Sequence, residues 1–435
     1  MARGRRMATQ ARAGFDLPPT AGMPLSWRDL LPGGDADLAR GMAAFLGVPA
    51  AQVTCSGTAA LVIALTALRR LAPARTTVVV PAYTCPLVAL AVAHCGLALR
   101  VCDSLPDSLD MDPAAMAASC DEGTLAIVPT HLAGRIADVP TACRIAHAVG
   151  AWVIEDAAQA LGATVDGQPV GLRGDAGFFS LAVGKGLTMF EGGVLISADP
   201  LLRALFDRVA TSVAPPRAGW EMRRRVELLA YAALYRPAGM RLAYGRPLRR
   251  DLARGDWIAA AGDDLDGPIP LHRPGAWRQS VAVRGLRRLP AFLADAARNA
   301  RTWMARLAAV PGLSLIDDRD GAGVWPVVLV LLPDRVARDA ALAELWGSGH
   351  GVSLPFVHVL PDYAYLREVV PAAPDGALRH ARDVADRVLA IGNSRWVTDA
   401  DREHVCTVLR RHAATGITAS ARSGGAVEVA GEPRV

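Results

Sequence analysis

Lysine is almost absent from this sequence of 435 residues. Of its 47 lysine and arginine residues, all but Lys185 are arginine. Arginine carries surface charge as well as lysine does, but a guanidinium neither loses its proton near neutral pH nor forms an imine with a carbonyl compound. The single amine is therefore either a remaining surface charge or a reactive group, and composition alone leaves both interpretations open.

Cysteine pairs and long apolar segments are missing too. The cysteines are odd in number, form no C-x-x-C pair and lack histidine-rich spacing, so neither a disulfide framework nor a metal site is predicted. The seven are Cys55, Cys85, Cys95, Cys102, Cys120, Cys143 and Cys406. The basic N-terminus lacks the apolar core of a secretory signal, and no run is apolar enough to span a membrane. We expect a reduced, cytoplasmic protein without an integral membrane segment.

The charge pattern does not favour nucleic acid as a partner. The formal net charge of +5 is small for this length, and acidic residues are interspersed with the arginines. No nucleic-acid groove is predicted, whereas anionic small molecules remain possible substrates. Hydrophobic residues make up 52% of the chain and charged residues 20%, which is typical of a globular protein, and the length suits two or three packed units.

Short apolar runs alternate with helical stretches over residues 50–200. Runs such as TTVVVPAY, LAIVPTH, AWVIEDA and AGFFSLA are separated by segments such as GTAALVIALTALRRL and DVPTACRIAHAVG. This alternation predicts an α/β fold with a mostly parallel sheet that helices cover on both faces. Sites in such sheets lie at the carboxyl ends of the strands.

The rest of the chain divides by composition. We expect a flexible leader over 1–25, a large-domain core over 26–205, a helical, arginine-rich insertion over 206–275, a smaller C-terminal α+β domain over 276–413 and a disordered tail over 414–435. The insertion could touch a membrane as an amphipathic helix, or it could form a solvated or subunit-covering helix pair.

Two motifs offer candidate binding groups. Ser56, Gly57 and Thr58 immediately precede an apolar helix, and the free N–H groups and dipole of a helix start favour an anion. The same triplet also begins ordinary helices. Asp156 ends an apolar strand, where a carboxylate is costly unless it is paired, and Gln159 follows three residues later. Asp156 could equally cap the next helix.

Ser180 and His131 are two further candidates. Ser180 ends a strand ahead of Lys185 and could donate to a phosphate or bond to the backbone. His131 lies at a predicted strand end in PTHLAG and could reach the site or be a satisfied structural histidine. Taken together, a phosphate cradle, the Asp156 carboxylate and the Lys185 amine are the parts that hold pyridoxal 5'-phosphate. They would anchor its phosphate, keep its pyridine nitrogen protonated and link its aldehyde.

Several motifs in consistent order resemble the DegT/DnrJ/StrS family of pyridoxal-phosphate-dependent nucleotide-sugar aminotransferases. They are FLGVPAAQVTCSGTAALVIAL, VVVPAYTCP, AIVPTHLAGRIADVPTACRIAHAVGAWVIEDAAQALGA and GDAGFFSLAVGKGLTMFEGGVLIS. The resemblance implies fold type I of the PLP-dependent transferases. In that fold a large domain holds a mostly parallel seven-stranded sheet between helices, and a smaller C-terminal α+β domain follows. A homodimer with sites between the subunits is also implied.

The resemblance implies a role for most of the candidate residues. Those that would contact the cofactor are Lys185 as the Schiff-base residue, Asp156 at the ring nitrogen, Gln159 on the phenolic oxygen side, and Ser56, Gly57, Thr58 and Ser180 around the phosphate. The family places an aromatic ring directly after the threonine of its P-x-x-T motif. Here Cys85 follows Thr84 and Tyr83 precedes it, and Tyr83 is included among the predicted cofactor-binding residues. The segment by which a partner subunit usually completes the phosphate site is not recognisable in VATSVAPPRAGW.

The activity that the resemblance implies is transfer of an amino group from an amino donor, L-glutamate, to a keto group of a nucleotide-linked sugar, for amino-sugar, polysaccharide or glycoside biosynthesis. Family members that act as dehydratases carry histidine in place of the lysine, so the retained Lys185 favours transamination. Two alternatives stay open. One is a PLP enzyme of another reaction type, such as a sugar dehydratase or lyase, and the other is a non-catalytic PLP-binding regulator.

Overall fold

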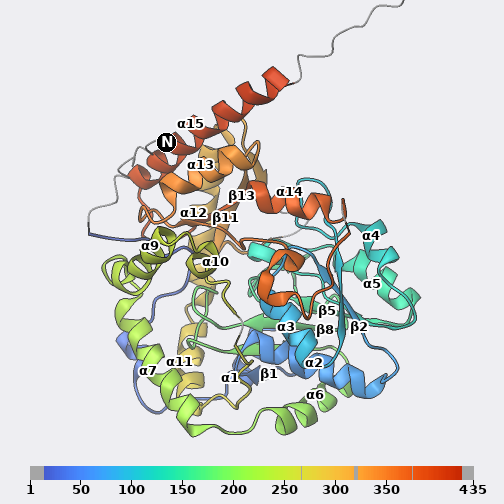
Figure 1. The fold of residues 1–435 in the computed structure, drawn as a ribbon. Coiled ribbons are helices and arrows are strands. Elements are labelled where there is room, and N and C mark those ends of the chain that lie inside the picture. The colour runs from blue at the N-terminus through green and yellow to red at the C-terminus, as the bar shows by residue number, and fades with distance from the viewer. Residues whose placement is uncertain (1–13, 266, 318–321, 375, 424–435) are drawn as a thin grey trace, which may run out of the picture.

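The large domain is built on one seven-stranded sheet (Figure 1). The computed structural model describes residues 14–423 except 266, 318–321 and 375. The strand order is β1 (Gln52–Thr54), β9 (Gly193–Ile196), β8 (Ala176–Ser180), β5 (Trp152–Asp156), β4 (Thr124–Ile127), β2 (Thr77–Pro81) and β3 (Ala98–Cys102). The strands from β8 to β3 are parallel, while β9 and β1 are antiparallel to their neighbours. The expected mostly parallel, seven-stranded α/β sheet is confirmed.

Helices cover both faces of this sheet because successive strand residues point to opposite sides. In β2, Val78 and Val80 pack into one core with α2 (Gly57–Leu71), α3 (Pro86–His94) and α6 (Pro200–Val213). Val79 packs into another core on the opposite face. The helices of that second core are α4 (Pro113–Ala118) and α5 (Val139–Ala148). A third core joins α1 (Leu38–Leu46) to β8 and β9.

Short elements complete the large domain. They are the 3-10 helices η1 (Trp27–Leu30) and η2 (Leu132–Gly134) and the small antiparallel pair β6 (Thr164–Val165) and β7 (Gln168–Pro169). Helix α6 crosses the boundary predicted at residue 205 and packs on α2, so it belongs to the large domain. The insertion therefore begins after Val213.

The insertion runs along one side of the molecule from the large to the small domain (Figure 1). Its elements are α7 (Ala218–Leu234), α8 (Pro237–Met240), the π-helical turn η3 (Arg241–Gly245), α9 (Arg246–Ala253) and α10 (Trp257–Ala261). On the large-domain side, Leu228 and Tyr231 of α7 pack with Val281 of α11 (Ala276–Leu286). On the other side, Leu248 of α9 enters the core of the small domain.

The small domain has an antiparallel sheet with the order β10 (Ser314–Ile316), β11 (Val327–Leu331), β13 (Val388–Gly392) and β12 (Val352–Ser353). Its helices are α12 (Leu289–Ala308), α13 (Arg335–Leu345), α14 (Arg379–Arg387) and α15 (Asp399–Ser423), with the 3-10 turns η4 (Leu360–Asp362) and η5 (Ala364–Leu366). The expected smaller C-terminal α+β domain is confirmed.

Both predicted flexible ends are ordered in part. Leu17 and Met23 of the expected leader are buried, and the Leu17 N–H donates to the Gly349 carbonyl of the small domain. The leader prediction is therefore wrong for residues 14–25, and residues 1–13 lie outside the described part. Helix α15 continues to Ser423, so the tail predicted over 414–435 is helical over its first residues, and 424–435 lie outside the description. No helix among the described residues has the length and apolarity to cross a membrane.

Candidate active site

A cavity of about 700 Å³ opens at the carboxyl ends of the parallel strands. Thr84 follows β2, Thr130 follows β4, Asp156 ends β5 and Ser180 ends β8, and all four line this cavity. Lys185 lines it from the loop after β8. Because the ends of parallel strands meet at one edge of a sheet, motifs that are far apart in the sequence converge here.

The start of α2 forms one end of the cavity. Ser56 is the N-cap, and its Oγ accepts a hydrogen bond from the Ala59 N–H at 3.0 Å. The N–H groups of Gly57 and Thr58 lie in the first turn, where a helix offers them no acceptor. A β-carbon on Gly57 would lie 3.2 Å from the Ser180 β-carbon, a tight contact that glycine avoids. Amide groups and a hydroxyl thus form a cradle suited to a phosphate.

Ser180 faces the same cradle from the end of β8. Its Oγ accepts from the Ala182 N–H at 3.3 Å, which leaves the hydroxyl hydrogen able to donate into the cavity. The loop that follows is held closed by backbone bonds from Leu181 N–H to the Gly192 carbonyl at 2.7 Å and from Met189 N–H to the Leu181 carbonyl at 3.2 Å. This closed loop carries Lys185 back toward the sheet.

Lys185 lies between two positions where the backbone is left-handed, and both are glycine. Gly184 has φ +78° and Gly186 φ +80°, values that side chains beyond glycine rarely adopt. Within the described ranges, no hydrogen bond or ion pair is assigned to the Lys185 ammonium. Burial lowers its pKa from the ordinary lysine value, and this outweighs the opposing effects of Cys85 and Asp156. The amine is thus shifted toward the neutral, nucleophilic form.

Two consecutive carboxylates end β5 and point in opposite directions. Asp156, which is 4% exposed, lines the cavity, and its Oδ1 accepts from the Ala158 N–H at 3.0 Å. Burial raises the pKa of Asp156, while the nearby positive charge of Lys185 opposes this shift. A cation placed beside this carboxylate would therefore be strongly favoured.

Glu155 is a residue that the sequence did not single out, and it holds this strand end in place. Its carboxylate accepts from the backbone N–H groups of Gly171, Arg173 and Gly174 at 2.6–2.7 Å. The His131 Nε2–H donates to it at 3.0 Å, and the other ring nitrogen of His131 accepts from the Ala137 N–H at 3.1 Å. Both nitrogens are satisfied, so the structural role for His131 is the one that the geometry supports.

Gln159 presents its amide to the cavity in a fixed orientation. Its Oε1 accepts from the Ala133 N–H at 2.8 Å, so the amide nitrogen remains the donor for a ligand. Ala133 has φ +56° in the tight turn η2, which brings this N–H toward Gln159. The turn after β4 thus decides which end of the amide faces the cavity.

The structure places Tyr83 away from the cavity, contrary to its predicted role in cofactor binding. Its hydroxyl donates to the Phe356 carbonyl at 2.9 Å and accepts from the Phe356 N–H at 3.2 Å. The ring belongs to a core shared with the small domain, where it packs edge-on against the Phe356 ring. Thr84 and Cys85 line the cavity instead, and burial raises the pKa of the Cys85 thiol to about 12.

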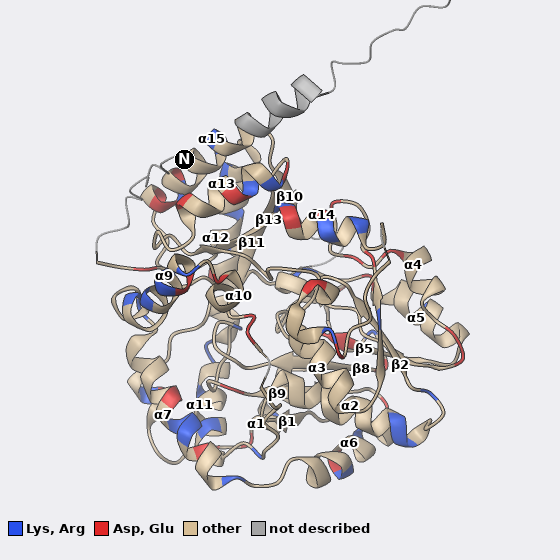
Figure 2. Cartoon of the chain, viewed as in Figure 1, with Lys and Arg blue, Asp and Glu red and all other residues tan. Residues whose placement is uncertain are grey.

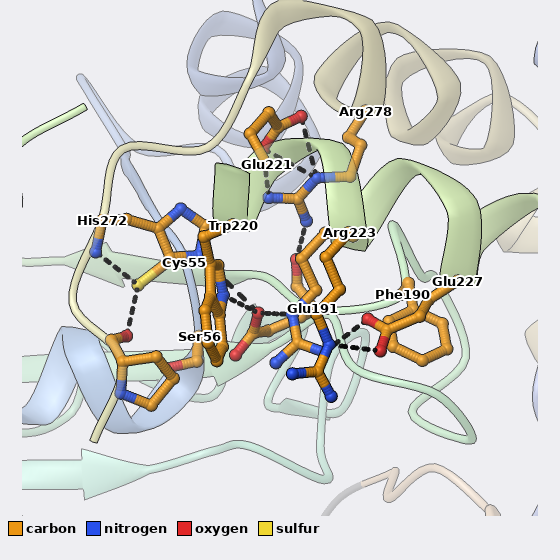
Figure 3. A network of polar contacts seen from close by, with 12 residues as sticks. Cys55, Ser56, Phe190, Glu191, Trp220, Glu221, Arg223, Glu227, His272 and Arg278 are labelled. Carbon is orange, nitrogen blue, oxygen red and sulfur yellow. Dashed lines mark hydrogen bonds and ion pairs between the residues drawn. The ribbon is translucent and has the colours of Figure 1, made fainter. Parts of the chain in front are cut away.

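The insertion supplies the outer wall of the cavity, which the sequence did not predict. Trp220, Arg223 and Arg224 at the start of α7 line it together with Glu191 (Figure 3). The Arg224 guanidinium is an ion-pair partner of Glu191 and also donates to Glu227 at 2.5 Å. Arg223 donates to Glu227 only through Nε, at 3.0 Å, and its side chain is 62% exposed.

A buried ion pair fastens α7 to the lysine loop. Arg278 is fully buried, and its Nη2 donates to Glu221 at 2.7 Å (Figure 3). Its Nη1 donates to the carbonyls of Met189 at 3.3 Å and Glu191 at 2.5 Å. One guanidinium therefore connects three segments that meet beside the cavity, which are α7, α11 and the loop that carries Lys185.

His272 and Cys55 extend this network toward the cradle. The Cys55 thiol donates to the Pro270 carbonyl at 3.3 Å and accepts from the His272 N–H at 3.5 Å. The His272 Nε2 is buried without a hydrogen-bond partner and lies 3.7 Å from Glu191. Arg224, His272 and Trp220 hold the pKa of Glu191 below its usual range despite its burial.

The donor set matches the polar groups of pyridoxal phosphate. The cradle and Ser180 suit the phosphate, Asp156 suits a protonated ring nitrogen, and the Gln159 amide suits the phenolic oxygen. Lys185 supplies the amine that an aldehyde requires. No group of three His, Cys, Asp or Glu side chains in the described ranges is placed to hold a metal ion.

Known proteins resemble this chain at two levels. The L-glutamine:2-deoxy-scyllo-inosose aminotransferase of Streptomyces kanamyceticus is 36% identical over 40% of this chain and 42% of its own length. The GDP-perosamine synthase of Caulobacter vibrioides is 36% identical over 38% of this chain and 44% of its own. The chain thus matches less than half the length of these relatives.

The fold likeness extends over nearly the whole chain. The solved structure of DesI in the presence of its TDP-sugar product matches with a TM-score of 0.69 and 24% identity, over 95% of this chain and 97% of that one. This likeness confirms fold type I of the PLP-dependent transferases. The model of the DegT/DnrJ/EryC1/StrS aminotransferase family matches residues 34–212, the segment that holds the cradle, Asp156 and Lys185. Over residues 34–212 the chain is similar to the DegT/DnrJ/EryC1/StrS aminotransferase family.

Proposed function

We propose that this protein is a PLP-dependent aminotransferase that moves an amino group from L-glutamate to a keto group of a nucleotide-linked sugar. One observation carries the proposal: the only lysine of the chain faces the cavity with a lowered pKa, opposite the buried Asp156 and beside the α2 cradle. No other side chain of this protein combines a primary amine with this position.

The cofactor, when bound, supplies an aldehyde that takes up and releases the amino group and a cationic ring that draws electrons from the substrate α-carbon. Lys185 removes the proton from that α-carbon and returns a proton at the opposite end of the transfer, which requires an amine that is neutral at working pH. Asp156 keeps the proton on the ring nitrogen. Ser56, Gly57 and Ser180 bind the phosphate and fix its position.

The atoms balance over two half-reactions. In the first, the amino acid gives up its amino group and leaves as a 2-oxo acid. In the second, the keto sugar takes the same nitrogen in place of its oxygen and leaves as an amino sugar. Lys185 moves the proton in both half-reactions. The acceptor would enter the cavity beside the wall that Trp220 and Arg223 form.

Arg223 supports an acceptor that carries phosphate. Its Nε is used by Glu227 and its guanidinium lies 5.3 Å from the centre of the Trp220 ring, while its two terminal nitrogens make no hydrogen bond within the described residues. A guanidinium with both terminal nitrogens available can fork onto phosphate oxygens. Asp264 also lines the cavity and suits the hydroxyl groups of a sugar. We also propose, with the family, a cytoplasmic homodimer.

An experiment must decide between two kinds of amino acceptor, because one relative is named for a cyclitol and the other for a nucleotide sugar. The holoenzyme is mixed with L-glutamate alone, and the cofactor absorbance and 2-oxo acid release are followed. Keto-sugars linked to UDP, GDP or TDP, and a keto-cyclitol, are then offered, and the products are weighed. A cofactor spectrum indifferent to every amino donor would reject the aminotransferase proposal. Amination of the cyclitol alone would reject the nucleotide-linked acceptor.

A further inference from the structure

Positive charge is concentrated in the insertion. Residues 217–254 hold ten arginines and three carboxylates, an excess of seven positive charges, while the whole chain has a net charge of +5. The rest of the protein is therefore slightly acidic. Figure 2 shows these basic residues gathered on α7 and α9 along one side of the molecule.

Each of the three carboxylates of this segment forms an ion pair with an arginine of the same chain. Glu221 is held by the buried Arg278 at 2.7 Å, and Glu227 accepts from two arginines of its own helix. Asp251 is 8% exposed and pairs with Arg250 at 2.9 Å. Arg217, Arg236 and Arg246 are exposed, so the outward potential of the segment is positive.

An apolar stripe lies on the outer side of α7. Met222, Val226 and Leu229 are 57%, 60% and 48% exposed. Their spacing of four and three residues places them on one face of the helix. The opposite face is already buried through Leu228 and Tyr231, so the helix has apolar residues on both sides and only the inner side is packed. Leu242, 53% exposed, adds to the apolar surface of the segment.

We propose that this α7–α9 face, defined by Met222, Val226, Leu229, Arg217, Arg236 and Arg246, binds the surface of an anionic membrane. A helix that lies in the membrane interface needs an apolar stripe to enter the acyl boundary and basic residues to meet the lipid phosphates. The stripe lies on α7, while the exposed arginines lie just before that helix (Arg217), just after it (Arg236) and on α9 (Arg246). Long arginine side chains can reach headgroups while their stems cover apolar surface. The attachment is peripheral.

Charge decides between this occupant and two others. A second copy of the chain in a two-fold contact would bring an excess of seven positive charges against the same excess. A nucleic acid would meet the arginines but would leave the stripe of Met222, Val226 and Leu229 in water. Only an anionic lipid surface offers phosphates and hydrocarbon together.

The test uses the holoenzyme and vesicles in a flotation assay. Vesicles of phosphatidylcholine alone are compared with vesicles that also contain phosphatidylglycerol, at low and high salt. We expect the wild type to float only with the anionic vesicles and to be released by salt. Absence of binding to the anionic vesicles, or equal binding to both kinds, would overturn the proposal.

Two variants separate the apolar and the charged contributions. Val226→Glu with Leu229→Glu, and Arg217→Gln with Arg236→Gln and Arg246→Gln, should each reduce the bound fraction at least tenfold. Val336→Glu is the matched control, because Val336 is 78% exposed on α13 and lies outside the insertion. None of these side chains lines the cavity, so amino transfer should be unchanged. Full binding by either variant contradicts the proposal.

Two further measurements cover the other occupants. If the stripe were a contact between copies, light scattering would show that the Val226→Glu, Leu229→Glu variant has a smaller mass than the wild type. If the face bound nucleic acid, duplex DNA would bind wild type and stripe variant equally and displace the vesicles. Either result overturns the proposal, whereas an unchanged mass together with stripe-dependent vesicle binding supports it.

Discussion

Replacement of Lys185 by arginine tests the chemistry with the smallest change in charge and shape. The side chain faces a cavity of about 700 Å³, and no side-chain hydrogen bond or ion pair is assigned to it in the described ranges. The larger guanidinium therefore has room, and few contacts are lost. We expect the fold to persist and the free energy of unfolding to fall by about 1–3 kcal/mol, because a permanently charged guanidinium replaces an amine whose neutral form burial favours.

The expected loss of activity is large because a guanidinium keeps its proton. Burial lowers the pKa of Lys185, which supplies the neutral amine that proton transfer requires, while arginine stays protonated at every working pH. A positioned base contributes about 10²–10⁴-fold to a rate, or about 3–5 kcal/mol of the barrier. The covalent link to the cofactor is lost as well. We expect kcat for transamination to fall by at least about 10⁴-fold.

Three measurements read out this prediction. Turnover is followed as 2-oxo acid released from L-glutamate in the presence of the accepted sugar. Borohydride reduction and peptide mass analysis should find the cofactor attached to Lys185 in the wild type and absent from the variant. Far-ultraviolet circular dichroism and a urea titration establish that the fold persists. A folded Lys185→Arg protein with more than about one hundredth of wild-type turnover would refute the assignment.

Three other substitutions test the supporting structure. Glu155→Gln replaces an acceptor of four hydrogen bonds by an amide that can accept on only one side, so the free energy of unfolding should fall by about 2–6 kcal/mol in a urea titration. The folded state lowers the pKa of Glu155, so the stability that its carboxylate contributes is present above the unfolded pKa near 4.5 and is lost as the pH falls through the folded pKa. The stability of Glu155→Gln should therefore fall less steeply with acid than that of the wild type, and an equally steep fall would contradict this. Arg223→Gln should raise KM for a nucleotide sugar at least tenfold and leave the glutamate half-reaction unchanged, with Arg225→Gln, which does not line the cavity, as its control. Glu221→Gln weakens the charged partner of a buried guanidinium and should cost about 1–3 kcal/mol of stability; an unchanged melting curve would show that the Met189 and Glu191 carbonyls suffice for Arg278.

The cradle, Asp156 and Lys185 could be located from the sequence because each lies in a local motif at a strand end. Period and composition identify the strands, and the geometry of a parallel sheet then brings their carboxyl ends together. The sequence could not assign Tyr83, because the residue that it contacts lies in the small domain, 273 residues further along the chain. The partner of the Tyr83 hydroxyl is the backbone of Phe356, a contact that no local pattern announces.

The polar network beside the cavity could not be predicted from the sequence, for a related reason. Glu221 and Arg278 are two ordinary charges, 57 residues apart in the sequence, until the fold buries them against each other. Likewise, Glu155 is adjacent to Asp156 and chemically similar, and only the alternation of β5 sends one into a ring of backbone N–H groups and the other into the cavity. Where chemically similar residues differ in role, the three-dimensional surroundings carry the distinction.

Helix α7 shows how one helix can serve two surfaces. Its apolar residues do not follow a single helical face, because Leu228 and Tyr231 face inward while Met222 and Val226 face outward. A helix that only covered the large domain would need the inner set alone, and exposure of the outer set costs solubility without stabilising the fold. The ion pair of Glu221 with Arg278 fixes the rotation of the helix about its axis, so the outer stripe and the cavity wall at Trp220 are set together.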